Sequence, residues 1–338
     1  MPPALYSYPI LRRIPPDGGE LWPKRVGGQV VEEITRRELL GRTAQVGGLM
    51  MAASILPQRV FGANDRVRVG LIGCGGMGRG DLSTFLAYPE VDCPVVCDVD
   101  DHQAARAQVL VEETRGNRPD TVRDFRRVLD RKDIDAVIVA TPDHWHALPT
   151  VLACQAGKDV YVEKPLAKTI AEGRAMVEAT RRHGRVVQMG TQWRSHASIG
   201  EAVQFVRSGK LGKIRFVRCW AYHDWLGDIG NPPDSQPPEG VDYDMWLGPA
   251  PKRPFNPNRY HFNFRWFWDY AGGLMTDWGV HQINVALWAM GTAPPKTVSS
   301  SGGKYVLNDN SETPDTQIAV FDFPTYVLIW EHQVQCGV

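Results

Sequence analysis

Short apolar runs alternate with longer amphipathic segments over residues 66–190. The runs are rich in Val and Ile and lie between Gly, Pro or Asp residues, as strands buried on both faces of a parallel sheet do. We expect strands at 66–73, 95–97, 135–140, 159–162 and 186–189, and helices at 79–88, 101–113, 145–156 and 169–183. Strands that alternate with helices predict an α/β domain with a doubly wound parallel sheet.

A different pattern follows residue 190. A proline- and glycine-rich loop is expected over 226–262, and a loop of this length in a compact domain commonly has a function, here as a pocket wall or a subunit contact. Further strands are expected at 213–221, 297–306, 316–323 and 326–332. The last of these lies close to Val338, so we expect the second sheet to be incomplete at its C-terminal end.

Composition excludes several classes of protein. The chain has 338 residues, of which 43% are hydrophobic and 22% charged, enough for a two-domain globular protein. Lys and Arg number 38, as do Asp and Glu, so charge gives no reason to expect nucleic acid as a partner. No apolar run has the length of a membrane span, and the six cysteines form no CxxC pair that would indicate a zinc site or a disulfide scaffold.

The N-terminal region has the features of an export signal. Thr35-Arg36-Arg37-Glu38-Leu39-Leu40 precedes a mildly apolar stretch over 46–56, and small residues follow at 60–63. Twin arginines, a modest apolar core and a small-residue cleavage site resemble a bacterial twin-arginine signal, although Gly41 stands where Lys is common. We expect a periplasmic or exported protein, or a cytoplasmic one if the signal is not functional.

A glycine-rich motif follows the first expected strand. Gly73-Cys74-Gly75-Gly76-Met77-Gly78 is a complete G-x-G-x-x-G between a strand and a helix. Gly73 permits the tight turn, Gly75 lets the backbone approach a pyrophosphate, and Gly78 lets the helix pack closely on the strand. Asp98, about 20 residues further on, ends the second strand and can accept hydrogen bonds from ribose hydroxyls. The motif predicts a dinucleotide site that favours NAD. NADP is an alternative cofactor, because nearby Arg side chains can bind a 2′-phosphate.

Polar residues follow the later strands, at the sheet edge where α/β proteins bind ligands. Thr141-Pro142-Asp143-His144-Trp145-His146 comes after one strand, and Glu163-Lys164-Pro165 after the next. Asp277 and His281 stand four residues apart; on a helix they share a face, and Asp277 is then able to orient the imidazole. Residues 143–146 offer no third ligand at suitable spacing, so we expect no metal site.

Together these motifs resemble the glucose–fructose oxidoreductase/inositol dehydrogenase/MocA (Gfo/Idh/MocA) family over residues 66 to about 330. The resemblance implies an N-terminal Rossmann domain and a C-terminal α/β domain with an open, mainly antiparallel sheet. We therefore expect a signal segment at 1–63, an NAD(P)-binding domain at 64–190 and a substrate and oligomerisation domain at 191–338. A homo-oligomer is compatible with the family, many of whose members pair sheet faces.

The resemblance also implies site residues. Lys164 matches the family's catalytic lysine, and Asp277 and His281 match the acid and histidine that complete the site. The expected cofactor-binding residues are Gly73, Gly75, Gly76, Met77, Gly78, Asp98, Thr141, Pro142, His146, Glu163 and Lys164. Arg194 matches a polar position near the substrate, whereas Asn284 stands where the family often has Asp. Tryptophans concentrate between 220 and 290, and Trp225 or Trp266 is expected to contact a saccharide while the others fill the core.

The activity implied is NAD(P)-dependent hydride transfer between a sugar or polyol hydroxyl carbon and the nicotinamide. His281 is the expected base, and Lys164 places an ammonium where alkoxide charge develops. One alternative is an NAD-dependent glycosidase or lyase, in which transient oxidation acidifies a neighbouring C–H bond and permits elimination. Another is a non-catalytic sugar- or nucleotide-binding homologue.

Overall fold

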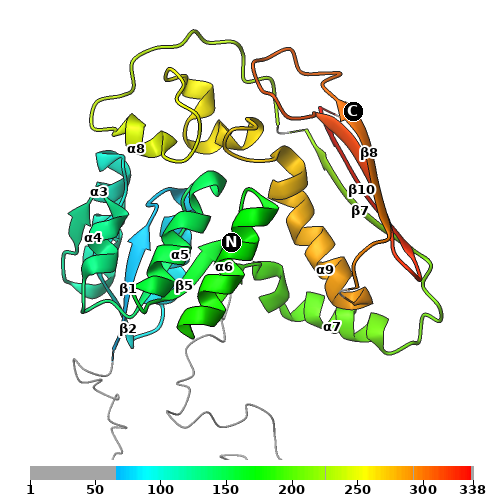
Figure 1. Ribbon diagram of the computed structural model, residues 1–338, viewed down its shortest axis with the longest axis horizontal. Helices are drawn as coiled ribbons and strands as arrows, with labels where there is room; N and C mark the ends of the chain where they lie inside the picture. Colours follow the sequence, from blue (N-terminus) through cyan, green and yellow to red (C-terminus); the bar gives the residue numbers. More distant parts are fainter. Residues whose placement is uncertain (1–65, 225, 292, 336–338) are drawn as a thin grey trace, which may run out of the picture. The chain divides into compact units, whose positions relative to one another are not determined.

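The computed structural model describes residues 66–335, apart from residues 225 and 292 (Figure 1). The expected export segment at 1–63, Trp225 and Cys336 lie outside the described residues. The five cysteines within them are free and buried. No helix in the described part of the chain has the length and apolar character needed to cross a membrane.

Six parallel strands form the first sheet, in the order β3-β2-β1-β4-β5-β6. This confirms the predicted doubly wound sheet. The strand order reverses between β1 and β4, and a crevice for ligands opens beyond the carboxyl ends of the strands at such a point. The strands are β1 (Val67–Ile72), β2 (Val91–Cys97), β3 (Asp120–Val122), β4 (Ala136–Val139), β5 (Asp159–Glu163) and β6 (Val187–Gly190).

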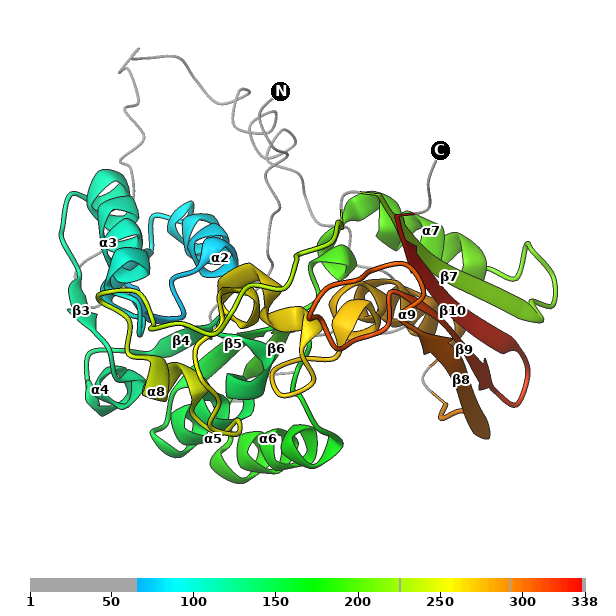
Figure 2. The same cartoon turned by 90° about the horizontal axis from the view of Figure 1, so that it is seen from above.

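Helices cover both faces of this sheet. Figure 2 shows α2 and α3 on one face and α4, α5 and α6 on the other. The sequence specifies several helix ends locally: Thr169 and Glu172 form a capping box at the start of α6, and Gly184 ends that helix at a φ of 58°. The helices are α2 (Gly76–Leu86), α3 (Asp101–Arg115), α4 (Phe125–Asp130), α5 (Ala147–Gln155) and α6 (Ile170–His183).

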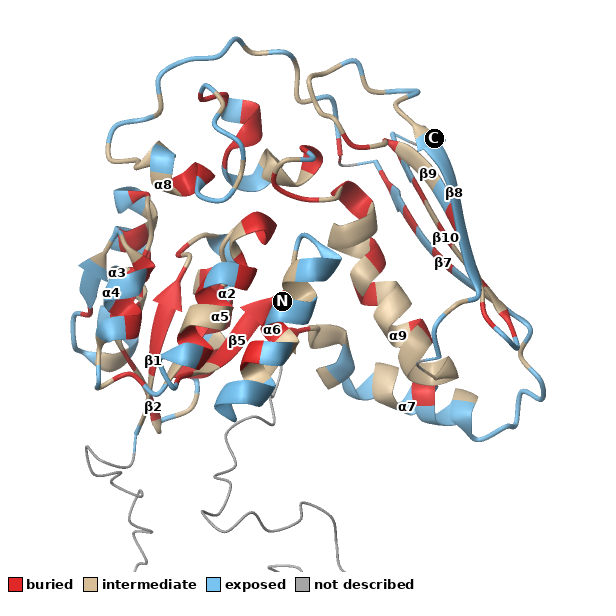
Figure 3. Cartoon of the chain, in the orientation of Figure 1, coloured by how far each residue is buried: buried red, intermediate tan, exposed pale blue. Residues whose placement is uncertain are grey.

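The core of the first sheet consists of the apolar runs that predicted its strands. Leu71, Ile138 and Val162, from β1, β4 and β5, are almost completely buried (Figure 3). Strand β3 and helix α4 were not predicted. Strand β3 carries only exposed or half-buried side chains, so it shows no apolar run.

A second, four-stranded sheet follows, in the order β7-β10-β9-β8. β10 (Val327–Val334) is parallel to β7 (Phe216–His223) and antiparallel to β9 (Thr316–Asp322), which in turn pairs antiparallel with β8 (Thr297–Gly303). The predicted, mainly antiparallel sheet is therefore confirmed. Helix α9 (Val280–Met290) packs on one face around Trp330, whereas α7 (Ala197–Arg207) lies against α9.

The predicted long loop after β7 contains short structured elements. These are helix α8 (Tyr243–Leu247) and the 3₁₀ turns η5 (Pro257–Arg259) and η6 (His261–Trp266). They enclose an aromatic core centred on Tyr270, which is fully buried against Trp246 at a ring distance of 4.8 Å. This core fixes the course of the loop past the carboxyl ends of the first sheet.

Candidate active site

The glycine-rich motif forms the turn between β1 and α2. Gly73 has a φ of 94°, which a residue with a side chain rarely adopts. A Cβ at Gly78 would overlap the carbonyl oxygen of Gly73, so this glycine permits the close approach of helix and strand. A Cβ at Gly75 or Gly76 would meet nothing within 4 Å. The turn therefore leaves an open space in front of the α2 N-terminus, where backbone N–H groups can bind an anion.

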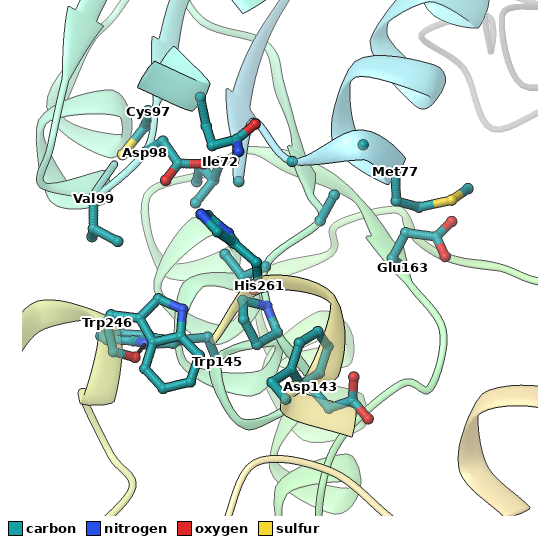
Figure 4. A pocket seen from close by; sticks show the side chains of 18 of the residues that line it. Ile72, Met77, Cys97, Asp98, Val99, Asp143, Trp145, Glu163, Trp246 and His261 are labelled. Carbon is teal, nitrogen blue, oxygen red and sulfur yellow. Dashed lines mark hydrogen bonds between the residues drawn. The ribbon is translucent and has the colours of Figure 1, made fainter. Parts of the chain in front are cut away.

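A cavity of about 520 Å³ extends from this turn past the ends of the strands (Figure 4). Its wall includes Asp98 at the end of β2 and His261 from the predicted loop. Nine of the eleven expected cofactor-binding residues line it, and Gly78 and His146 do not. The nine are Gly73, Gly75, Gly76, Met77, Asp98, Thr141, Pro142, Glu163 and Lys164.

Asp98 is fixed by backbone N–H groups. Its carboxylate accepts hydrogen bonds from the N–H groups of Cys74, at 2.6 Å, and Asp100, at 2.9 Å. Burial raises the pKa of Asp98 to about 6, against the opposing effect of these hydrogen bonds. The Cys74 bond ties the carboxylate to the glycine-rich turn, so both groups face the same end of the cavity.

Of the residues after β4, Thr141 lines the cavity and His146 is buried. The Thr141 hydroxyl oxygen is buried and has no hydrogen-bond partner among the described residues, although Thr141 lines the cavity. His146 was expected to line the cofactor and instead is 1% exposed. Its two ring nitrogens lie 2.6 Å from the Pro165 carbonyl oxygen and 2.8 Å from that of Thr141. His146 therefore joins the loops after β4 and β5 from behind the cavity.

Lys164 and Asp277 meet at the end of the cavity farther along the sheet. The Lys164 Nζ atom lies 2.5 Å from the Asp277 Oδ1 atom, and both side chains are about 15% exposed (14% and 15%). Arg265 Nε lies 3.5 Å from the other carboxylate oxygen of Asp277. Burial acts to raise the pKa of Asp277, but the Arg265 guanidinium and Lys164 ammonium outweigh it and lower that pKa. Asp277 is thus a buried carboxylate held between two cations.

His281 differs from its expected arrangement. Asp277 lies in a π-helical turn, η7 (Met275–Gly279), and not in a regular helix. Its carboxylate binds Lys164, and the Nδ1 atom of His281 is buried without a partner in the described part of the chain. The expected orienting hydrogen bond from the His281 imidazole to Asp277 is therefore absent there. Burial and the nearby Lys164 ammonium lower the pKa of His281 to about 4, so the imidazole is neutral at pH 7.

Two further carboxyl groups line the same end of the cavity. Burial raises the pKa of Glu163 to about 7 and that of Asp143 to about 7, although the Lys164 ammonium acts in the opposite direction on both. Asp143 and Arg265 were not among the predicted site residues. The run TPDHWH, which contains Asp143, indicated only a loop that lines a ligand. The run RWFWD, which contains Arg265, indicated only aromatic packing.

Residues 240–261 form a strap along the wall of the cavity near Asp98. Backbone hydrogen bonds join the strap to Val99 and Asp101, the two neighbours of Asp100 in the sequence. The Asp100 carboxylate lies 2.9 Å from His261 Nε2 and accepts a hydrogen bond from the Tyr260 hydroxyl at 3.2 Å. Between these two ends of the strap, the Trp246 carbonyl oxygen accepts hydrogen bonds from the side chains of His144 and Trp145.

Of the expected substrate residues, Arg194, Trp266 and Asn284 are described, and they do not line the main cavity. Arg194 Nε donates to Asn284 Oδ1 at 2.5 Å, so these two bind each other. Trp266 is 9% exposed within the aromatic core and lines only a smaller cavity of about 140 Å³, because the turn η6 directs it inward. Trp225 lies outside the described residues.

The arrangement fits a bound dinucleotide. The open space at Gly75 and Gly76 matches a pyrophosphate, the Asp98 carboxylate matches ribose hydroxyls, and the unpartnered Thr141 hydroxyl is a further hydrogen-bonding group facing the cavity. Within the described ranges, no group of three or more His, Cys, Asp or Glu side chains is arranged to hold a metal ion. The Nε2 atom of His144 and the Nδ1 atom of His146 instead lie at hydrogen-bond distance from backbone carbonyl oxygens.

Known proteins are similar in sequence to about half of this chain. A levoglucosan dehydrogenase from Pseudarthrobacter phenanthrenivorans is 30% identical over 174 residues, which are 49% of this chain and 43% of that protein. A glycosyl hydrolase family 109 protein from Saccharopolyspora erythraea is 35% identical over 173 residues, 48% of this chain and 37% of that protein. The chain thus spans less than half the length of these curated relatives.

Solved structures resemble the fold. A levoglucosan dehydrogenase in complex with NADH and levoglucosan superposes with a TM-score of 0.62 at 23% identity, covering 80% of this chain and 68% of that one. Two family models match the sequence. The oxidoreductase family model with the NAD-binding Rossmann fold matches residues 67–191, and the C-terminal alpha/beta domain model of the same family matches residues 213–300. The chain belongs to the Gfo/Idh/MocA family of NAD-binding oxidoreductases.

Proposed function

We propose that this protein transfers a hydride between a hydroxyl carbon of a sugar or polyol and NAD. The observation that carries the proposal is the buried Lys164–Asp277 pair, which lies in the same cavity as the glycine-rich turn. The levoglucosan dehydrogenase relative supports a sugar as the substrate class. Glu163 and Thr141 would hold the cofactor close to this pair, and Asp98 and Gly75 would hold its adenosine and pyrophosphate parts.

Oxidation of a CH–OH group releases a hydride and a proton. NAD⁺, when bound, supplies the hydride acceptor. His281 is not among the residues that line the cavity but lies near Lys164 and Asp277, and its imidazole is neutral at pH 7, the protonation state that can take the hydroxyl proton. The Lys164 ammonium stabilises the negative charge that develops on the oxygen, and Asp277 holds that ammonium in place through the 2.5 Å contact. The carbon–oxygen single bond thereby becomes a carbonyl, and the proton leaves through His281.

The first test is a spectrophotometric screen of the purified full-length chain. With NAD⁺ and a panel containing levoglucosan, glucose and myo-inositol, we expect absorbance at 340 nm to rise steadily with at least one compound. His281→Gln is the control for enzyme-dependent turnover. A flat absorbance with every compound, at saturating NAD⁺ and across pH 6–10, would contradict a dehydrogenase.

The same screen separates a second candidate, a redox-neutral glycosidase. The family 109 relative favours this candidate because it is named as a glycosyl hydrolase. In such a reaction the hydride returns to the substrate after elimination, so net NADH does not accumulate. Release of p-nitrophenol from p-nitrophenyl glycosides, with NAD⁺ required but absorbance at 340 nm unchanged, would identify it. Sugar binding measured by calorimetry without either reaction would indicate a non-catalytic homologue.

We also propose export by the twin-arginine route. The motif Thr35-Arg36-Arg37-Glu38-Leu39-Leu40 and the apolar stretch at 46–56 support it. Residues 1–63 fused to a fluorescent protein are expected to place it in the periplasm of a bacterium with that pathway. Arg36→Lys with Arg37→Lys is the matched variant that should keep the fusion in the cytoplasm. Equal cytoplasmic retention of both fusions would refute export.

A further inference from the structure

One face of helix α9 meets the 3₁₀ turn η4 (Gln192–Ser195), which follows strand β6. His281, Asn284 and Trp288 share this face because they are spaced by three and four residues. The turn places Trp193 on the first of them, with ring centroids 5.3 Å apart and ring planes 20° from parallel. Arg194 covers the other two: it hydrogen-bonds to Asn284, and its guanidinium lies 5.3 Å from the Trp288 ring.

His281 is held by this contact in an unusual way for a proton-transferring histidine. Such a residue commonly has a carboxylate that fixes its ring orientation. Here the Asp277 carboxylate is bound by Lys164 and Arg265, and Nδ1 of His281 has no partner among the residues that the structure describes. The ring is nevertheless 8% exposed, so its surroundings fix it by packing.

We propose that Trp193 is a positioning residue that holds the His281 imidazole in its reactive orientation by stacking on it and excluding water. The inference rests on the proposed function, in which His281 takes the substrate proton. Trp193 was not predicted as a site residue, because the sequence does not distinguish a tryptophan that stacks on a site residue from one that packs in the core. The near-parallel geometry restricts rotation of the imidazole about its terminal side-chain bond, which otherwise has a broad preference.

The charged groups around the ring set the pH range of the expected effect. Lys164, which follows β5, and Asp277 from η7 act on it directly. On η4 the charged side chain is Arg194, which binds Asn284. On α7 the charged side chains are Glu201 and Arg207, and both are exposed. On β7, His223 packs on Trp278. Loss of the Trp193 indole admits water to one ring face, which weakens the burial that lowers the pKa of His281.

The test compares Trp193→Leu, Trp193→Phe and Trp268→Leu in the full-length chain with NAD⁺. Levoglucosan is the first probe, replaced by the fastest substrate of the panel if it is not oxidised. For Trp193→Leu we expect kcat/KM at pH 7 to fall about 10-fold, and the acidic limb of its pH profile to move upward by about one pH unit. Trp193→Phe keeps an aromatic face and should stay within about 3-fold of wild type. Trp268→Leu makes the same change at a half-exposed tryptophan and should alter neither quantity.

A measurement without turnover makes the result independent of substrate. The His281 ring protons, assigned in NMR spectra by their loss in His281→Gln, should titrate at higher pH in Trp193→Leu than in wild type. Trp193→Met replaces Trp193→Leu if the latter does not fold. An unmoved titration together with an unmoved acidic limb would overturn the role of Trp193. Full activity of His281→Gln would instead overturn the proposed base, whatever the result at Trp193.

Discussion

Replacing Lys164 by methionine is expected to lower kcat by about 10²–10³-fold, the loss that follows removal of a single donor to a developing oxyanion. Methionine keeps an unbranched side chain of similar length, so packing at the end of β5 changes little. It removes the ammonium that lies 2.5 Å from the Asp277 carboxylate and leaves Arg265 as the cation beside it. The affinity for NAD⁺, measured by calorimetry, should stay within about 3-fold of wild type, because the lost interaction is stronger in the transition state than with the bound cofactor.

Lys252→Met is the matched control for this substitution. Lys252 is 83% exposed and pairs with Asp244 on the surface, so kcat, NAD⁺ affinity and stability should all be unchanged. A Lys164→Met enzyme with a wild-type kcat would remove Lys164 from the chemistry. An equal loss of NAD⁺ affinity and kcat would assign it to cofactor binding alone.

Alanine at Gly78 is expected to destabilise the protein and to weaken NAD⁺ binding at least about 10-fold. The new Cβ would overlap the carbonyl oxygen of Gly73, so α2 must shift away from the turn. Overpacking of this kind costs about 1–3 kcal/mol in the free energy of unfolding, which urea denaturation measures. The shift also displaces the helix N-terminus that faces the open space at Gly75 and Gly76.

Gly75→Ala separates cofactor binding from folding. Its Cβ would meet nothing within 4 Å, so the free energy of unfolding without NAD should change by no more than about 0.5 kcal/mol. The same methyl group occupies the space expected for a pyrophosphate, so the Kd for NAD⁺ should rise at least about 10-fold. Gly80→Ala lies on the exposed side of α2, where nothing lies within 4 Å of the added carbon, and should leave the Kd unchanged. Equal Kd values for Gly75→Ala and Gly80→Ala would place the cofactor elsewhere.

The sequence predicted the first sheet and its glycine-rich turn because their signals are local. Apolar runs such as Val67–Ile72 and the spacing of Gly73, Gly75 and Gly78 lie within a few residues of one another. Thr169 and Glu172 likewise specify a helix start from adjacent positions. The strands of the second sheet were also predicted, whereas their mainly antiparallel arrangement was expected from a family resemblance, because strands such as β8 show no buried face that would indicate how they pair.

The contacts that complete the site are between residues far apart in the sequence. Lys164 and Asp277 are separated by 113 residues. No periodicity in the sequence indicates that the Asp277 carboxylate binds the Lys164 ammonium and not the His281 imidazole. No pattern in the sequence predicts the π-helical turn η7 either. This turn places Asp277 away from the position it would have in a regular i, i+4 pair with His281. Trp193 and Arg265 could be recognised only once η4, α9 and η6 were placed together.

The strap has a consequence for how long a nucleotide stays bound. Val99, Trp246, Tyr260 and His261 line the cavity, so a dinucleotide in it lies behind them. On a release path past this wall, the hydrogen bonds to Asp100 and to the Trp246 carbonyl oxygen would break, and each contributes about 0.5–1.5 kcal/mol. We therefore expect local opening of residues 240–261 to limit the dissociation rate of NADH. A slow rate would favour reactions that reoxidise the nucleotide in place over those that exchange it with the surrounding pool.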